Sequence, residues 1–219
     1  LEAGNSAKAG ILEVYPDAYV NVFKMADGGE GTMDTIISST FGELVKVEVS
    51  DPLGRSITSK YGYIPETKTA VIEMAEASGI TLISAEERNP MLTSTYGTGQ
   101  IIKDAVNRGC RDFIIGIGGS ATNDGGVGML EALGFEFVDE NDCNVERGAV
   151  GLSRIAKIKT DNALTQLKDC HFSVACDVKN PLCGENGCSA VYGPQKGATP
   201  EMICQMDGWL EKYARLAET

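Results

Sequence analysis

Asp112-Phe-Ile-Ile-Gly-Ile117, followed by Gly118-Gly-Ser-Ala-Thr-Asn-Asp-Gly-Gly126, is the stretch that decides the fold class. The first part is a continuous apolar run, which is typical of a strand buried on both faces of a sheet. The second part is a glycine-rich loop, and residues 127–133 after it predict a helix that Gly134 ends. A strand, a glycine loop and a helix in this order place a ligand at the carboxyl end of the strand and at the start of the helix.

Strands and helices alternate on both sides of this stretch. Alternating apolar and polar residues predict strands over residues 43–50 and 57–64, which the turn at residues 51–54 joins as a hairpin. Thr199 and Pro200 have the N-cap and first-turn character that begins the last helix. Further strands are predicted over residues 18–23, 69–74 and 170–178, and helices over residues 1–14, 33–39, 100–108 and 199–217. These elements predict an α/β fold with some antiparallel pairing.

Composition excludes two classes of partner. The chain has 219 residues, of which 42% are hydrophobic, so it can build a packed core. Its formal net charge is -12, which repels both nucleic acid and anionic membrane surfaces. An anionic ligand would therefore need backbone N–H groups, a metal ion or a few well-placed cations to reverse the field locally. No apolar run approaches the length that spans a membrane.

The seven cysteines predict a reducing, cytoplasmic environment. Their number is odd and no C-x-x-C pair occurs, which is unlike a disulfide framework of a secreted protein. A zinc site could use Cys176, Cys183 and Cys188, but their spacing matches no zinc template. The single histidine, His171, lies in a predicted strand, and we interpret it as a core or edge residue.

The loop at residues 118–126 is the first candidate site. Its glycines let the backbone approach a ligand and present N–H donors, its hydroxyl and amide groups add neutral hydrogen bonds, and its aspartate adds a carboxylate. The loop lacks the Gly-Lys-Ser/Thr of a Walker A motif and does not match G-x-G-x-x-G, which disfavours a dinucleotide site. A tight turn without a ligand is the structural alternative. The candidate residues are Gly118, Gly119, Ser120, Thr122, Asn123, Asp124 and Gly125.

A second glycine-rich loop precedes the helix predicted at residues 33–39. Asp27 and Glu30 could hold Mg²⁺, and Asp27 could accept a proton from a substrate hydroxyl. The alternative is simple capping of the helix by acidic groups. The candidate binding residues of this loop are Gly28, Gly29, Glu30 and Thr32.

Four smaller features add to these loops. The first consists of Gly97, Thr98 and Gly99, which lie ahead of a predicted helix. This segment could present N–H groups to an anion. Asp177 and Asn180 follow a strand and form a loop rim. Lys196, between glycines, is the best candidate for a cation that faces phosphate, and Arg55 is a second cation for a carboxylate. Together these features indicate phosphoryl transfer, which needs positioning, backbone donors, Mg²⁺ and a few cations.

The motifs occur as an ordered set that resembles the class I (bacterial-type) glycerate kinase family. The set consists of Ala26-Asp-Gly-Gly-Glu-Gly-Thr32, Tyr96-Gly-Thr-Gly99, Gly116-Ile-Gly-Gly-Ser-Ala-Thr-Asn-Asp-Gly-Gly126 and Gly193-Pro-Gln-Lys-Gly-Ala198. The resemblance covers nearly the whole chain. It implies ATP-dependent phosphorylation of D-glycerate, with Mg²⁺, to 2-phosphoglycerate.

The resemblance also implies a two-domain α/β fold. A discontinuous, Rossmann-like outer domain would include residues 1–46, and an inserted mixed α/β domain would include residues 47–219. Family members begin with a strand and an Asp-Ser-x-Lys-Gly loop that are absent here, and they continue beyond Thr219. We therefore expect a partial chain, whose activity belongs to the longer parent protein.

In the expected mechanism, the glycerate hydroxyl attacks the γ-phosphorus of ATP. Asp27 or Asp124 accepts the proton, and Lys196 and Mg²⁺ offset charge on the transferred group. Which loop holds ATP and which holds glycerate stays open. ATP and glycerate are the expected partners, with no nucleic acid or membrane, and a homodimer stays open. Two rival functions are a module that binds a hydroxy acid without catalysis and an NAD-dependent dehydrogenase.

Overall fold

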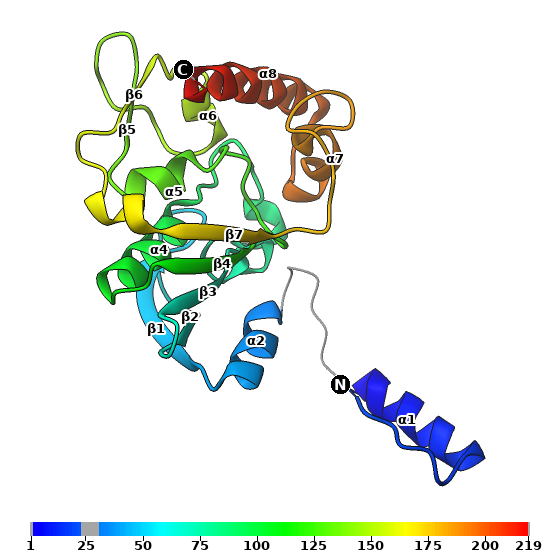
Figure 1. Ribbon diagram of the computed structural model, residues 1–219. Helices are drawn as coiled ribbons and strands as arrows, with labels where there is room; N and C mark the ends of the chain where they lie inside the picture. Colours follow the sequence, from blue (N-terminus) through cyan, green and yellow to red (C-terminus); the bar gives the residue numbers. More distant parts are fainter. Residues whose placement is uncertain (1, 23–30, 219) are drawn as a thin grey trace.

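The fold is built on one mixed sheet of five strands. The computed structural model describes residues 2–22 and 31–218. The strands lie in the order β1-β2-β3-β4-β7 (Figure 1). Their bounds are β1 (Glu43–Ser50), β2 (Ser56–Ile64), β3 (Thr69–Glu73), β4 (Asp112–Gly116) and β7 (His171–Ala175).

Pairing in this sheet changes from antiparallel to parallel along its width. β1, β2 and β3 pair antiparallel, whereas β3, β4 and β7 pair parallel. The carboxyl ends of β3, β4 and β7 therefore meet at one edge, where open α/β sheets bind their ligands. The mixed α/β class predicted from the sequence is confirmed.

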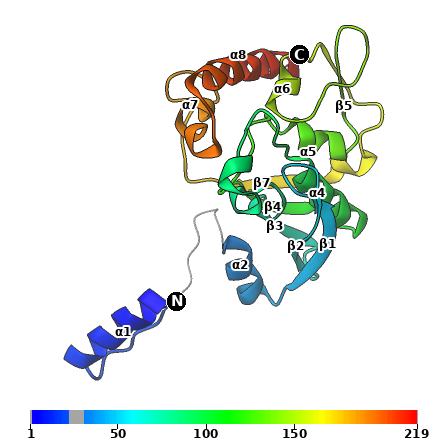
Figure 2. The same cartoon turned by 180° about the vertical axis from the view of Figure 1, so that it is seen from behind.

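Helices cover both faces of the sheet. α4 (Tyr96–Asn107) lies on one face with α5 (Val127–Ala132) against it, and α2 (Thr32–Thr40) lies on the other, as both views show (Figure 2). Side chains alternate along β3, so that Ala70 and Ile72 join the core with α4, while Val71 joins the core with α2. Burial of a side chain such as Ile72 stabilises the fold by about 2 kcal/mol.

A smaller unit forms the upper part of the molecule in Figure 1. β5 (Glu136–Val138) and β6 (Lys157–Lys159) pair antiparallel, and α8 (Pro200–Ala217) contacts β6 and packs against α6 (Ala149–Leu152) and α7 (Cys188–Tyr192). Phe137, Leu152, Met206 and Leu210 are buried in its core. Thr199 caps α8 as predicted, because its side chain accepts a hydrogen bond from the Met202 N–H.

The remaining helices are short or lie apart from the sheet. α1 (Glu2–Val14) confirms the first predicted helix, but it buries no residue and stands away from the sheet (Figure 1). The others, too short for sequence periodicity to reveal, are α3 (Ala75–Ser78), η1 (Ile80–Leu82), η2 (Ala85–Glu87), η3 (Thr165–Asp169) and η4 (Pro194–Lys196). Among residues 2–22 and 31–218, no helix is both long and apolar enough to cross a membrane.

The predicted elements are mostly confirmed, and the exceptions have physical reasons. The strand expected over residues 18–23 is wrong for residues 18–22, since none of the described strands lies beside them to complete a ladder. The helix expected from residue 100 begins earlier, at Tyr96, and β7 ends at Ala175 rather than at residue 178. Residue 46, the proposed domain boundary, lies inside β1, and the division into two domains stays a prediction.

Candidate functional site

The loop that follows β4 lies at the carboxyl edge of the sheet, as predicted. It is fixed there by the segment after β3, because the Ile80 N–H donates to the Gly119 carbonyl and the Ala121 N–H donates to the Ser78 carbonyl. Gly119 has a φ of 72°, which favours glycine. Residues 117–120 are accessible or partly accessible, whereas residues 121–124 are buried.

Lys196 comes from the other side of this loop. It ends η4, where Gly197 turns the chain with a φ of 91°. Its Nζ donates hydrogen bonds to the Ser120 Oγ at 2.8 Å and to the Thr122 carbonyl at 2.7 Å. Burial lowers the pKa of Lys196 to about 8, although the charges of Cys188 and Asp124 act in the opposite direction. The structure thus brings together two predicted site residues, Lys196 and Ser120.

Asp124 is 1% exposed, and its carboxylate is used by the fold. Oδ2 accepts hydrogen bonds from the Thr95 N–H and the Thr95 hydroxyl, at 2.8 and 2.9 Å, and longer ones from the Ser94 hydroxyl and the Gly128 N–H. Oδ1 accepts from the Gly126 N–H. The carboxylate therefore joins the starts of α4 and α5, which favours a positioning role for Asp124 over proton transfer. The choice between these roles stays a prediction.

Thr122 and Asn123 are also buried, so their side chains face protein. The Asn123 Nδ2 donates to the Ser189 Oγ at 2.8 Å and contacts the Met206 Sδ at 3.3 Å. These contacts attach the loop to α7 and α8. The Asn123 amide therefore has a structural role, and ligand binding by Thr122 and Asn123, expected from the sequence, stays a prediction.

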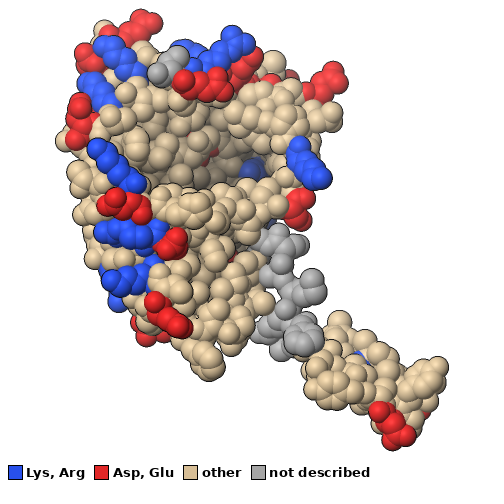
Figure 3. All heavy atoms as spheres, in the orientation of Figure 1, with Lys and Arg blue, Asp and Glu red and all other residues tan. Residues whose placement is uncertain are grey.

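The accessible half of the loop keeps its donors free. No acceptor among residues 2–22 and 31–218 pairs with the N–H groups of Gly118, Gly119 or Ser120. Figure 3 shows a hollow on this face between the α7–α8 unit and the end of the sheet, with atoms of Lys or Arg at its floor. Free backbone donors and a buried lysine are the groups that bind an anion.

Residues 97–99 do not form a loop ahead of a helix, as the sequence predicted, because α4 begins at Tyr96 and contains them. All three are buried. A Cβ on Gly97 would lie 1.9 Å from the Ser50 carbonyl oxygen, and one on Gly99 would lie 2.2 Å from the Met129 carbonyl oxygen. Close packing of α4 against β1 and α5 therefore accounts for both glycines, and Thr98 bonds to the Ser78 hydroxyl. A ligand contact by these residues stays a prediction.

The start of α2 lies at the same edge of the sheet. Thr32 is its first residue and is buried, as is Met33, whose N–H donates to the Glu73 Oε1 at 2.7 Å. The sequence analysis missed Glu73, although a carboxylate at the end of a fully buried strand was the available signal. Asp27, Gly28, Gly29 and Glu30 lie outside the described residues, and their predicted roles stay sequence predictions.

A pocket of about 450 Å³ opens beside Glu73 and carries mostly negative charge. Its charged lining residues are Asp34, Lys60, Glu73 and Glu76. Burial raises the pKa of the Glu76 carboxyl, and the charge of Glu73 adds to this effect, while Lys60 opposes it. Within the described part of the chain, no group of three or more His, Cys, Asp or Glu residues could hold a metal ion.

The remaining predicted site residues lie after β7. Asp177 and Asn180 are both exposed, which agrees with a loop rim. The Asn180 amide is used locally, because its Nδ2 donates to the Asn186 carbonyl and its Oδ1 accepts from the Tyr192 hydroxyl. All seven cysteines are free thiols, as predicted, and His171 lies on an edge strand.

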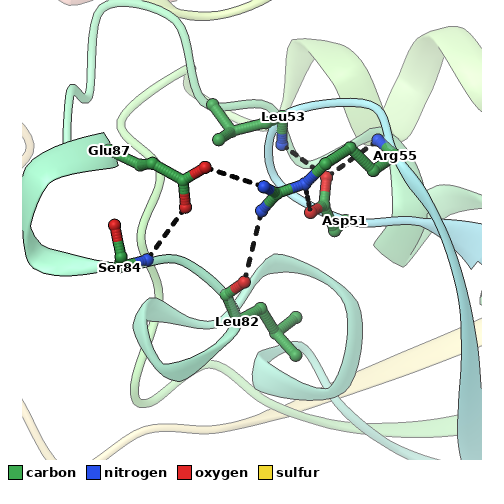
Figure 4. A network of polar contacts seen from close by, with 6 residues as sticks. All are labelled: Asp51, Leu53, Arg55, Leu82, Ser84 and Glu87. Carbon is green, nitrogen blue, oxygen red and sulfur yellow. Dashed lines mark hydrogen bonds and ion pairs between the residues drawn. The ribbon is translucent and has the colours of Figure 1, made fainter.

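Arg55 is not a free cation for a substrate carboxylate, and that expectation is corrected here. Its Nε pairs with the Asp51 Oδ2 at 2.6 Å and its Nη1 with the Glu87 Oε1 at 2.7 Å (Figure 4). A third contact runs from Nη2 to the Leu82 carbonyl oxygen. Two carboxylates already neutralise this guanidinium, so its charge holds together the β1–β2 turn and residues 82–87 instead.

Comparison with known proteins identifies the family of the chain. The family model described as "Glycerate kinase family" matches residues 1–219. The chain is 50% identical over 218 residues to "Glycerate kinase" of Haemophilus influenzae and 45% identical over 216 residues to "Glycerate 2-kinase" of Escherichia coli K12. The two matches cover 100% and 98% of this chain, but only 58% and 56% of the two relatives.

The fold has a solved relative as well. The crystal structure of a candidate glycerate kinase 2 from Salmonella typhimurium LT2 is 46% identical and superposes with a TM-score of 0.86 over 95% of this chain and 57% of that one. The chain thus spans a little more than half the length of the relatives it matches. On the match of the family model and on these relatives, the chain belongs to the glycerate kinase family.

Proposed function

We propose that the protein phosphorylates D-glycerate with ATP and forms 2-phosphoglycerate. The observation that carries this proposal is Lys196, a buried cation beside free backbone N–H groups at the carboxyl edge of the sheet. A chain with a net charge of -12 gains a site for anionic substrates only where such groups gather. The names of the relatives, glycerate kinase and glycerate 2-kinase, support the choice of substrate.

The anion is bound on the Lys196 side of the loop rather than at a helix N-terminus. The starts of α4 and α5 already face the carboxylate of Asp124, and the start of α2 faces Glu73. An internal carboxylate satisfies the donors that a phosphate would need there and also repels it. We therefore propose that Gly118, Gly119 and Ser120 donate to the transferred phosphoryl group and that Lys196 offsets its developing charge.

Proton transfer and magnesium binding rest on the sequence alone. Asp27 is the proposed acceptor of the glycerate proton, because Asp124 is used by the fold. Mg²⁺ would supply charge neutralisation at the phosphates, with Asp27 and Glu30 as its proposed ligands. Among the described residues, no group of three or more His, Cys, Asp or Glu side chains could hold the ion.

Location and assembly complete the proposal. The seven free thiols support a cytoplasmic location, where cysteines stay reduced. ATP and glycerate are the proposed partners. A homodimer stays a prediction, as does the division of the chain at residue 46.

A coupled assay on the intact protein tests the function. ADP release that depends on both ATP and D-glycerate is the expected result, with 2-phosphoglycerate as the product in ³¹P NMR. Tight binding of D-glycerate without ADP release would instead favour a binding module. Binding of a nicotinamide cofactor, measured by fluorescence, would favour the dehydrogenase.

A further inference from the structure

Arg88 follows Glu87 in the sequence, and Glu87 belongs to the network drawn in Figure 4. It directly follows η2 and caps it, with its N–H directed to the Ala85 carbonyl. Glu87, the residue before it, is held by the Arg55 guanidinium and by the Ser84 N–H. The backbone at Arg88 is therefore held by η2 and by the contacts of Glu87, so the base of its side chain has a defined place.

Arg88 is the arginine whose side chain has no hydrogen-bond or ion-pair partner among residues 2–22 and 31–218. Its Nε is the one buried side-chain nitrogen or oxygen, across the residues that the structure describes, that has no hydrogen-bond partner. Its guanidinium also forms no ion pair with a described residue. Its charge acts on the nearby Glu86 carboxyl without a direct contact. The other arginines bond as follows: Arg55 to Asp51 and Glu87, Arg108 to Tyr61, Arg111 to backbone carbonyls, Arg147 to Glu131, Arg154 to Asp139 and Glu146, and Arg215 to Glu211.

The unpaired arginine lies against the loop that carries Lys196. A Cβ on Gly197 would lie 2.3 Å from the Arg88 carbonyl oxygen and 3.1 Å from the Arg88 Cβ, so the two backbones are in close contact. The segment that follows Arg88 also bonds to the glycine-rich loop, since the Thr93 hydroxyl donates to the Ala121 carbonyl at 2.8 Å. Arg88 thus contacts the loop that carries Lys196, and the segment that it begins contacts the glycine-rich loop.

We infer that Arg88 is a second anion-binding residue of this site and that its guanidinium receives a carboxylate or phosphate group of a substrate. The inference rests on the proposed function and deepens it. A buried donor without a partner is costly, and a ligand oxygen removes that cost when it binds. The planar guanidinium matches the two oxygens of a carboxylate or phosphate, which an ammonium group does not.

The kinetics of Arg88→Met and Arg88→Lys in the intact protein test this inference. Arg88→Met is expected to raise the KM of one substrate by about 10- to 100-fold, as expected for a lost hydrogen bond to a charged group. A rise for glycerate identifies the carboxylate as the ligand, and a rise for ATP identifies a phosphate. Arg88→Lys keeps the charge without the paired donors, so its KM should lie between those of the wild type and Arg88→Met.

Stability separates this role from a structural one. Arg88→Met removes no side-chain hydrogen bond to a described residue, so its melting temperature should stay within a few degrees of wild type. The matched control is Arg215→Met, on the exposed face of α8, which should leave both KM values unchanged. If Arg88→Met left both KM values within twofold of wild type, or if it lowered the melting temperature without a selective rise in KM, the inference would be wrong.

Direct binding keeps the inference distinct from the proposed function. If the wild-type protein shows no turnover of glycerate, the proposed function fails, and calorimetric titration with D-glycerate, ATP and inorganic phosphate then tests Arg88 alone. Weaker binding of one of them to Arg88→Met supports the anion site. Equal binding of each to both proteins, or no binding of any to the wild type, overturns it.

Discussion

The two halves of the glycine-rich loop have opposite environments. Residues 118–120 are accessible, their N–H groups have no partner among the described residues, and Lys196 contacts Ser120. Asn123 and Asp124 are buried, and Asp124 accepts five hydrogen bonds from residues at the starts of α4 and α5. The first half can therefore bind a ligand, while the second half holds the loop in place.

This difference teaches that the charge of a residue in a glycine loop does not define its role. Asp124 and Lys196 are both buried, and each influences the other electrostatically. Asp124 is matched by donors of the fold, whereas Lys196 faces two neutral oxygens and has a lowered pKa. A buried charge that the fold leaves poorly compensated is a candidate for function.

Lys196→Met should give the largest effect on activity. Removal of the only cation that contacts the accessible half of the loop, among the residues described, should lower kcat/KM by about 1,000-fold in the coupled assay. Stability should change by no more than about 1 kcal/mol, because the loss of two hydrogen bonds is offset by removal of a buried charge.

The control for this substitution is Lys212→Met, an exposed lysine on α8. It should keep wild-type kinetics. Full activity in Lys196→Met would contradict the assignment of the accessible half as the phosphoryl site.

Asp124→Asn should act mainly on stability. The amide keeps one acceptor oxygen but presents an NH₂ group to donors, so urea unfolding should show a loss of about 2 to 4 kcal/mol. Asp207→Asn is the control, since Asp207 accepts a single backbone N–H near the surface and should cost less. If Asp124→Asn lost turnover at unchanged stability, Asp124 would be the proton acceptor after all.

The pH dependence of kcat/KM should show the smallest effect, and it tests the charge of Lys196 directly. The pKa of Lys196 is about 8 in the folded protein against 10.5 for an unperturbed lysine. Its charge, and with it the binding of anions, should fall above pH 8, so kcat/KM should decrease by up to about tenfold per pH unit there. A profile of kcat/KM that stays flat from pH 7 to pH 10 would contradict the role of Lys196.

The free energy of unfolding should instead rise as the pH rises. Between pH 8 and 10.5 the unfolded chain binds a proton at this lysine that the folded chain does not, so unfolding becomes harder as pH rises. Burial of the charged Lys196 destabilises the folded protein by about 3 kcal/mol below pH 8, and this destabilisation disappears near pH 10.5. Lys196→Met should remove this dependence, which urea unfolding of both proteins at several pH values can measure.

Local patterns in the sequence were sufficient for most of the fold. Alternation predicted β1 and β2, the apolar run predicted β4, and capping residues predicted the start of α8. The ordered motifs were sufficient for the family, because they depend on residue identity alone. Short elements such as η2 gave no signal, since they contain less than one period of a pattern.

The roles within the site could not be predicted in the same way. Arg55 and Arg88 are both arginines in loops, yet the structure pairs Arg55 with Asp51 and Glu87 and gives Arg88 no partner among the described residues. Gly97 and Gly99 suggested a loop, but close packing of α4 explains them. Each of these outcomes depends on a contact between residues far apart in the sequence.

The sequence by itself therefore determined the elements, the glycine-rich loop and the family. Backbone preferences and side-chain periodicity act over a few residues and are visible in the chain. Only the tertiary structure decided that residues 118–120 stay accessible, that Asp124 serves the fold and that Lys196 comes to lie against the loop. Burial and the choice of partner decide what a charged group can do, and both arise only when distant segments pack together.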